Sequence, residues 1–284
     1  MAGVSMKDIK LRIRSMESTK QITKAMEMVA SSKLRRAQER VLTSRPYFET
    51  LYKTVTDIAA ENWDFSSPYV QEGRVGAICE IVIAGDRGLA GGYNHNIIKL
   101  AQEDMAGKEA VVLPLGKKAL EHFRSHGATL VSERYDQVAD LSAEDCFAIA
   151  RQLCSAFRSG AYSQVRLAYT NFASVLVQTP CVLPLLPLPV PAKAAANRPA
   201  RELTLYEPSG EAVFNAIVPE FLGGLLYGAL CESLASELGA RRTAMDAATK
   251  NAEDMIDDLS LKYNRARQGA ITQEITEIVA GADA

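Results

Sequence analysis

Apolar residues at spacings of three and four mark both ends of the chain, a pattern typical of helices that pack as a coiled coil. The repeat runs through residues 9–58 near the N-terminus and through residues 214–278 near the C-terminus. All eleven prolines lie from Pro46 to Pro219, so long stretches at both ends lack the residue that interrupts helices. We therefore expect two long terminal helices that pair with each other in antiparallel orientation.

The same repeat predicts which side of each helix faces the other. Pro46 removes a backbone donor from the first helix, which predicts a kink or a local opening there. Many repeat positions hold Ala or Gly, which allow the helices to approach closely but bury little area. The expected contact positions include Ile9, Ile13, Met16, Thr19, Ile22, Met26 and Val29 in the first helix, and Met245, Ala248, Ala252, Met255 and Leu259 in the second.

Strand-like and helix-like segments alternate between the two repeats, which argues for a mainly parallel sheet covered by helices. The proline-rich stretch 180–191 is expected to be a stiff connector, followed by a loop with a short strand at Leu203–Tyr206. Strands are expected at Val75–Ala84, Ala110–Leu115, Ala128–Ser132, Gln164–Asn171 and Ser174–Val182, and helices at Asn94–Met105, Lys117–Ser125 and Ala143–Ser159.

The expected fold class is α/β: a long antiparallel coiled coil of the N- and C-terminal helices plus a central Rossmann-like α/β domain. The expected domains are the N-terminal coiled-coil helix at 1–58, the central domain with its proline-rich connector at 59–210, and the C-terminal coiled-coil helix at 211–284.

Composition and charge narrow the class of protein. The chain has 284 residues, of which 48% are hydrophobic, so it can bury a core, and its net charge of −2 gives no overall nucleic-acid signature. The charge is unevenly distributed: residues 1–45 carry a net +7 and residues 220–284 a net −5. Five scattered cysteines without a paired spacing predict reduced thiols. We find no secretory signal and no stretch of about 18 apolar residues, and expect a soluble protein.

Two segments offer candidate chemistry. The loop Gly85–Asn94 follows a strand and precedes a helix, where phosphate-binding loops sit, but it matches neither the Walker A spacing nor G-x-G-x-x-G. Its glycines also fit a tight strand–helix turn. His122 and His126 lie one helical turn apart, as metal ligands can, but they lack the Glu of the metalloprotease motif, which favours solvent-facing histidines. We therefore expect no catalytic residue, cofactor or metal.

Four segments resemble a known family. They are Ile22–Lys33, Gly85–Asn94, Ser236–Asn251 and Tyr263–Ile278, and they occur in the family's order from one end of the chain to the other. Together they resemble gamma subunits of the rotary F-type ATP synthase. The resemblance implies a non-catalytic rotor in a bacterial protein complex, peripheral on the cytoplasmic face of the plasma membrane. It also implies four partners: the α and β subunits of the catalytic ring, the epsilon subunit and the membrane rotor ring.

The resemblance also implies roles for individual residues. Contacts with β-subunit loops are implied for Met26, Lys24, Lys33, Arg35, Arg36, Arg267 and Gln268. An apolar bearing tip is implied for Ile271, Ile275, Ile278 and Val279, and a foot toward epsilon and the membrane ring for Tyr206 and Glu207.

Three alternatives remain open on the residues alone. The chain could be a nucleotide-binding α/β enzyme with a coiled-coil dimerisation arm, which requires a nucleotide at the 85–94 loop. It could be a nucleic-acid adaptor that uses the basic N-terminal face, and its binding would then depend steeply on salt. It could also be a plain antiparallel coiled coil, in which the charged faces serve pairing and solubility.

Overall fold

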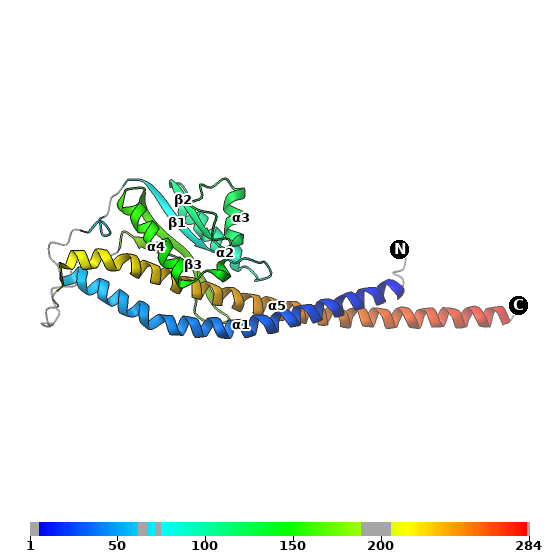
Figure 1. Cartoon of the computed structure of the whole chain (residues 1–284). Helices are drawn as coiled ribbons and strands as arrows, with labels where there is room; N and C mark the ends of the chain where they lie inside the picture. The colour runs from blue at the N-terminus through cyan, green and yellow to red at the C-terminus, as the bar shows by residue number, and fades with distance from the viewer. Residues whose placement is uncertain (1–5, 62–66, 72–74, 189–205, 283–284) are drawn as a thin grey trace. The chain divides into compact units, whose positions relative to one another are not determined.

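A computed structural model describes residues 6–61, 67–71, 75–188 and 206–282. Two long helices, α1 (Met6–Glu61) and α5 (Gly210–Ala282), carry most of the two ends of the chain (Figure 1). The chain forms two compact units. The coil unit consists of residues up to Ser32 and from Arg241 onward, and the α/β unit consists of Lys33–Ala240. Each long helix contributes to both units, so the units divide the chain at other places than the expected domain boundaries.

The α/β unit contains one four-stranded sheet with the strand order β2-β1-β3-β4. Strands β1, β2 and β3 are mutually parallel where they pair, and β4 runs antiparallel to β3. The expected mainly parallel sheet is thereby confirmed. Its elements are β1 (Ala77–Ile83), α2 (Tyr93–Met105), β2 (Ala110–Leu115), α3 (Lys117–Ser125), the 3-10 turn η1 (Val138–Asp140), α4 (Ala143–Arg158), β3 (Tyr162–Phe172) and β4 (Gln178–Leu186).

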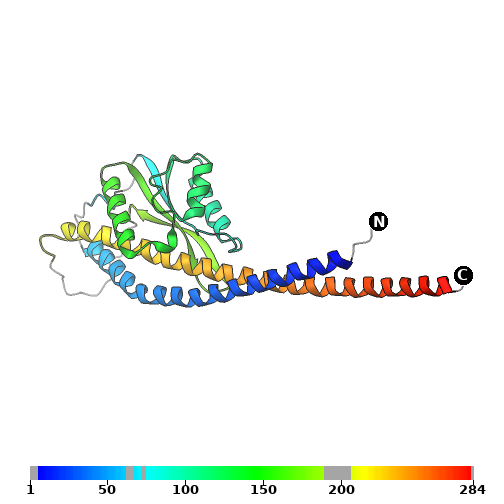
Figure 2. The ribbon, with the colours of Figure 1, turned by 45° about the vertical axis from the view of Figure 1, so that its right-hand side comes forward.

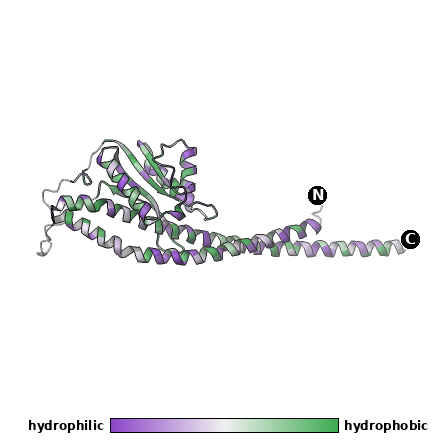
Figure 3. Cartoon of the chain, viewed as in Figure 1, coloured by the Kyte–Doolittle hydropathy of each residue, from purple (hydrophilic) through white to green (hydrophobic). Residues whose placement is uncertain are grey.

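Helices cover both faces of this sheet (Figure 2). One face packs on α4 and on α5, with Phe157 and Phe214 among the fully buried side chains. The other face packs on α2 and α3, through residues such as Ile97 and Phe123. Because side chains alternate along a strand, β1 supplies Ile81 to the first layer while neighbouring residues face the second. The green of the strands in Figure 3 shows that most of their residues are apolar.

Helix α5 is apolar where it belongs to the α/β core. Within Gly210–Gly281 it holds an 18-residue window with a mean hydropathy of 1.5, long and apolar enough to cross a membrane by length and composition. Half of that window is buried inside the structure. Val218, Leu222 and Leu226 of α5 lie in the core against the sheet and α4. The apolar stretch is thus accounted for as a core helix.

Two expected features differ from the structure, and a third is not tested by it. Pro180 and Pro184 belong to β4, which runs along the edge of the sheet, rather than to a connector. An edge strand tolerates proline because one side of its backbone has no partner strand. The strand expected at 128–132 is reduced to a single bridge between Val112 and Leu130. The later part of the connector and most of the strand expected near residue 203 lie outside the described residues.

All five cysteines are free thiols, as expected, and only Cys181 is not fully buried. Burial raises the pKa of the Cys79, Cys146 and Cys154 thiols to about 12, which keeps them protonated and unreactive.

Candidate functional site

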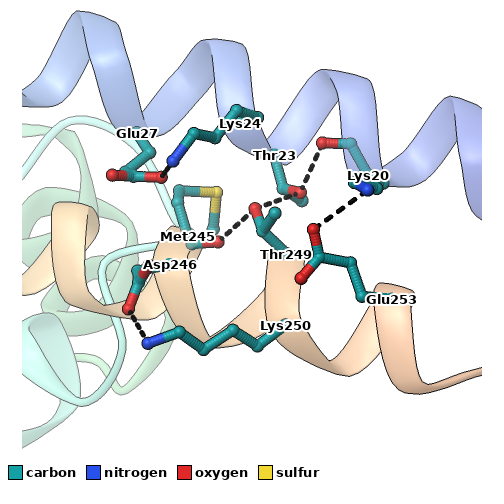
Figure 4. Close-up of polar contacts among 9 residues, drawn as sticks. All are labelled: Lys20, Thr23, Lys24, Glu27, Met245, Asp246, Thr249, Lys250 and Glu253. Atoms are coloured by element: carbon teal, nitrogen blue, oxygen red, sulfur yellow. Dashed lines mark hydrogen bonds and ion pairs between the residues drawn. The ribbon is translucent and has the colours of Figure 1, made fainter.

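A polar layer joins the two helices of the coil unit (Figure 4). The hydroxyl oxygens of Thr23 on α1 and Thr249 on α5 lie 2.8 Å apart. Thr249 is buried, and its hydroxyl also donates to the carbonyl of Met245 at 2.8 Å, one turn earlier in its own helix. A hydrogen bond between short side chains requires the two backbones to approach closely. This pair therefore ties the helices together at one register.

An ion pair flanks the threonine layer. Lys20 Nζ lies 2.9 Å from Glu253 Oε1, and both side chains are almost half exposed (Figure 4). The residue number falls on α1 as it rises on α5 between the two contacts, so the helices of this unit pair in antiparallel orientation, as expected. An exposed pair of this kind contributes at most about 1 kcal/mol, so it supports the register more than the stability.

The seam of the coil unit differs from the expected one. Ile22 and Val29 were expected to face α5, but they are 57% and 55% exposed. Ile9 and Ala30 are buried, as the repeat predicts, and the paired positions Lys20 and Thr23 were not expected. On α5 the expected positions Met245 and Ala252 are buried, and so is Thr249, which was not expected. Met255, another expected contact, is 53% exposed. The expectation was wrong at Ile22, Val29 and Met255, because it assigned every apolar residue to the partner helix within the chain. It is confirmed at other positions, which are buried: Ile9, Ala30, Met245 and Ala252.

The apolar residues left outside the seam form a surface of their own. Leu11, Ile22 and Val29 are separated by 11 and 7 residues, close to whole turns at about 100° per residue, so they share one side of α1. Each is more than half exposed. We call these three residues the outer face; it lies on roughly the opposite side of α1 from the seam. Their exposure makes this side of α1 a candidate surface for contact with another molecule.

The basic residues expected to contact partner loops occupy different situations. Lys24 donates to Glu27 within α1 at 2.8 Å, and this hydrogen bond and charge raise the pKa of Lys24 (Figure 4). Arg35 lies 3.6 Å from Glu39 with both side chains largely exposed, and Lys33 and Arg36 are exposed as well. Met26, by contrast, is half-buried.

The expected C-terminal contacts are solvent-exposed. Arg267 and Gln268 are exposed on α5, and every residue from Ile271 to Gly281 is exposed too. The expected bearing residues Ile271, Ile275, Ile278 and Val279 have exposed fractions of 43%, 56%, 71% and 56%. Such apolar exposure at a helix end suits contact with a partner, and the individual roles remain predictions.

The expected foot lies in the α/β unit. Tyr206 is half-buried and packs against the larger apolar core, whereas Glu207 is exposed. Their role as a foot remains a prediction.

Side chains of the loop Gly85–Asn94 form hydrogen bonds with backbone groups and thereby fix the position of the loop. The carboxylate of Asp86 accepts backbone N–H bonds from Lys117, Val138 and Ala139 at 3.3, 2.9 and 3.3 Å. Asn94 accepts from the N–H of Gly85 at 2.8 Å and donates to the carbonyl of Arg87 at 3.1 Å.

Helix α5 also reaches the start of this loop. A Cβ on Gly85 would lie 2.6 Å from Oε1 of Glu237, so a glycine lets α5 approach the loop closely. Asp86 thus holds the loop to the start of α3 and to η1, while Gly85 leaves room for Glu237 of α5. Sequence reasoning missed Glu237, because only the fold brings it to the loop.

The two neighbouring histidines stack on each other. The ring centroids of His122 and His126 lie 4.1 Å apart at an interplanar angle of 24°, and His126 Nδ1 lies 2.7 Å from the carbonyl of His122. Burial, followed by the charges of His126 and His95, lowers the pKa of His122. Nearly parallel rings do not converge on one ion. In the described part of the chain, no group of three or more His, Cys, Asp or Glu residues could hold a metal.

Comparison with known proteins supplies the family. A family model described as ATP synthase matches residues 5–284. The ATP synthase gamma chain of Ruminococcus albus is 45% identical over 280 residues, which cover 96% of each chain. The sodium ion specific ATP synthase gamma chain of Acetobacterium woodii is 40% identical over 301 residues, which cover 99% of this chain and 98% of the other.

Solved structures share the fold at lower identity. The rotor of the Euglena gracilis mitochondrial ATP synthase superposes with a TM-score of 0.64 at 18% identity, covering 94% of this chain and 98% of that one. The central stalk of the Tetrahymena thermophila mitochondrial ATP synthase gives a TM-score of 0.57 at 23% identity, covering 80% and 99%. The family model and the bacterial relatives match nearly the full length of the chain, and the paired helices and the α/β unit agree with them. The chain therefore belongs to the ATP synthase gamma-chain family.

Proposed function

We propose that this chain is the central-stalk rotor subunit of an F-type ATP synthase that translocates protons or sodium ions. The observation that carries the proposal is the outer face of α1. In a two-helix coil that served only its own pairing, Leu11, Ile22 and Val29 would lie in the seam, but they are exposed instead. A shaft enclosed by a ring of other subunits needs such a second apolar surface.

In this function the coil turns inside a ring of alternating α and β subunits, and the nucleotide sites belong to β. Ion flow through the membrane sector turns the shaft, and its asymmetry drives the β subunits through states of different affinity for nucleotide. The chain itself is non-catalytic. The engaged side chains of the 85–94 loop agree with that assignment, because Asp86 and Asn94 are used in holding the backbone.

The partner contacts follow from exposure and family resemblance. Lys33, Arg36 and Arg267 are exposed cations suited to acidic loops of β, and Gln268 lies beside the last of them. The exposed tip at Ile271–Val279 suits a bearing, because apolar side chains form few directional contacts that would lock rotation. We assign Tyr206 and Glu207 to the foot that meets epsilon and the membrane ring, and the exposure of Glu207 supports this assignment. The complex is attached to a membrane, and we place this chain at its cytoplasmic face.

A disulfide between rotor and stator tests the function. Arg267→Cys, paired with a cysteine in the facing loop of β, would link shaft to ring in the assembled complex, provided that the Cα atoms approach to about 5–6 Å. Oxidation should then stop multi-site turnover, and reductant should restore it. The half-buried Cys181 is first replaced by serine to avoid a competing link. Turnover that is equal before and after complete oxidation would contradict a turning shaft.

A disulfide within the rotor is the matched control. Thr23→Cys with Thr249→Cys uses two side chains whose oxygens already lie 2.8 Å apart. This link joins parts that move as one body, so turnover should survive oxidation. A static scaffold would be indifferent to both links, whereas a rotor responds to one.

A further inference from the structure

Glu80 is a buried acid in the middle of the sheet. It lies in β1 with no exposed surface, and among the described residues neither of its carboxylate oxygens has a hydrogen-bond partner. It lies two residues before Val82 in β1 and therefore on the same face of the sheet, the face that α2 and α3 cover. A charged carboxylate in such a place is costly unless it is paired. The residue therefore requires a physical explanation beyond packing.

A cation lies beside Glu80 but is engaged elsewhere. Arg166 of β3 is the register partner of Glu80 in the parallel pair. Its Nη1 donates to Asp104 Oδ2 at 2.5 Å, and its Nε and Nη2 donate to Gln164 Oε1 at 3.0 and 2.6 Å. The side chains of Arg166 and Asp104 are only 20% and 25% exposed. The guanidinium thus bonds to Asp104 at the end of α2, although Glu80 is its neighbour on the sheet.

The remaining charge near Glu80 comes from Lys108, just after α2. Its Nζ donates to the carbonyl of Asp104 at 2.5 Å and lies 3.7 Å from Asp104 Oδ1. The group facing Glu80 is therefore one acid, Asp104, and two cations, Arg166 and Lys108. When Glu80 is neutral, Arg166 and Lys108 both interact with a single carboxylate, that of Asp104. With Glu80 charged, two carboxylates share them.

We propose that Glu80 is a proton-controlled switch for the C-terminal end of α2. When protonated, Glu80 leaves Arg166 to Asp104, which fastens the last turn of the helix to β3. When it loses its proton to solvent, the new carboxylate draws Arg166 along the sheet, the bond to Asp104 breaks, and the end of α2 loosens. The change is a proton release and an exchange of ion-pair partners, with no other reactant.

Burial sets the range in which this switch operates. Burial, reinforced by the charge of Asp104, raises the pKa of Glu80 from 4.5 to about 8, while Arg166 and Lys108 act in the opposite direction. The acid is therefore protonated at neutral pH and ionises under mildly alkaline conditions.

Two measurements on the full-length chain test the proposal. The carboxyl carbon of Glu80, identified by its loss in Glu80→Gln, should titrate with a midpoint near the value of about 8. Amide exchange at Met105–Lys108, corrected for the intrinsic pH dependence, should accelerate about two- to fivefold through this midpoint, because an ion pair of moderate exposure is lost. Glu80→Gln should abolish that acceleration. A midpoint near 4.5, or the same acceleration in both proteins, would overturn the switch.

Neighbouring variants separate the exchange of partners from simple burial. Asp104→Asn removes a like charge near Glu80 and also the carboxylate that competes for Arg166. It should therefore lower the titration midpoint of Glu80. The measurement remains valid if α2 is weakened, because the Glu80 carboxyl is observed directly. Glu103→Gln is the matched control, because this exposed neighbour faces Lys99 at 3.7 Å and should leave the midpoint unchanged. An unchanged midpoint in Asp104→Asn would show that Arg166 is not shared.

Discussion

Thr23 and Thr249 bring their hydroxyl oxygens to 2.8 Å across the coil, at a place where a seam of apolar residues was expected. The contact lies between Ala30 and Ile9 on α1, both of which are buried. A polar pair within an otherwise small and apolar seam favours one register over its neighbours, because any slip by a turn leaves the hydroxyls without each other.

The threonine pair should show energetic coupling. Thr23→Val and Thr249→Val should each lower the free energy of unfolding by about 1 kcal/mol, because each removes a net hydrogen bond. In the double variant the free energy of unfolding should fall by about 0.5–1 kcal/mol less than the sum of the two single effects, because the hydrogen bond between the hydroxyls can be lost only once. Urea unfolding of the four proteins measures the cycle. Strict additivity would show that the hydroxyls do not interact.

The outer face should matter to assembly more than to folding. Ile22→Ala with Val29→Ala should change the free energy of unfolding of the isolated chain by only about 0.5 kcal/mol, because both residues are exposed. Association with the α and β subunits should weaken clearly, as titration of the chain into the ring would measure.

Met245→Ala provides the contrasting variant, because Met245 is buried in the same unit. It should cost about 2–5 kcal/mol in unfolding free energy. If the outer-face variant proved as destabilising as this one, the exposed residues would belong to the coil's own seam.

Substitution by alanine should destabilise the protein to very different extents at Gly116 and at Gly91. At Gly116 the backbone has φ = 100° and a Cβ would lie 2.1 Å from the carbonyl oxygen of Ala84, so Gly116→Ala should strongly destabilise the α/β unit. At Gly91, with φ = 55°, a Cβ would meet nothing within 4 Å, so Gly91→Ala should cost only about 1 kcal/mol of backbone strain. Thermal unfolding compares the two, and equal effects would contradict the close approach at Ala84.

The histidine stack predicts a loss of stability in acid. Burial lowers the pKa of His122 below its ordinary 6.5, so the unfolded chain binds a proton more readily than the folded one. The free energy of unfolding should therefore fall as the pH drops from 6.5 through the lower pKa that His122 has in the folded chain. It should be fully regained when the pH is raised above 6.5. His122→Asn should remove part of this slope in urea unfolding across pH. His95→Asn, a more distant neighbour, should remove less.

The local elements were predictable where short-range patterns decide them. The bounds of β2 and α3 agree with the expected 110–115 and 117–125, because an apolar run and an amphipathic run each end at a clear boundary. Helix α2 begins at Tyr93, one residue before the expected start at Asn94. Strand β4 was displaced by several residues, because its prolines were interpreted as a connector without knowledge that the strand lies at an edge.

The surface of α1 was less predictable, because the apolar pattern of a helix does not say which partner it serves. Ile22 and Val29 fit a heptad with α5 as well as Thr23 and Ala30 do, and only the packed structure separates them. Asp86 and Glu80 were missed for a different reason. Asp86 accepts a hydrogen bond from Val138, and Glu80 lies opposite Arg166 in the sheet. Both neighbours lie far away in the sequence, so no local pattern reveals them.

The prolines of β4 bear on how copies of this protein behave toward one another. Among the described strands, β4 pairs only with β3, so its other side is the kind of edge on which strands of other molecules can add. Pro180 and Pro184 lack the N–H groups that such an incoming strand would need. The edge is thereby protected against the addition of a strand from another copy, which lowers the tendency of the protein to aggregate.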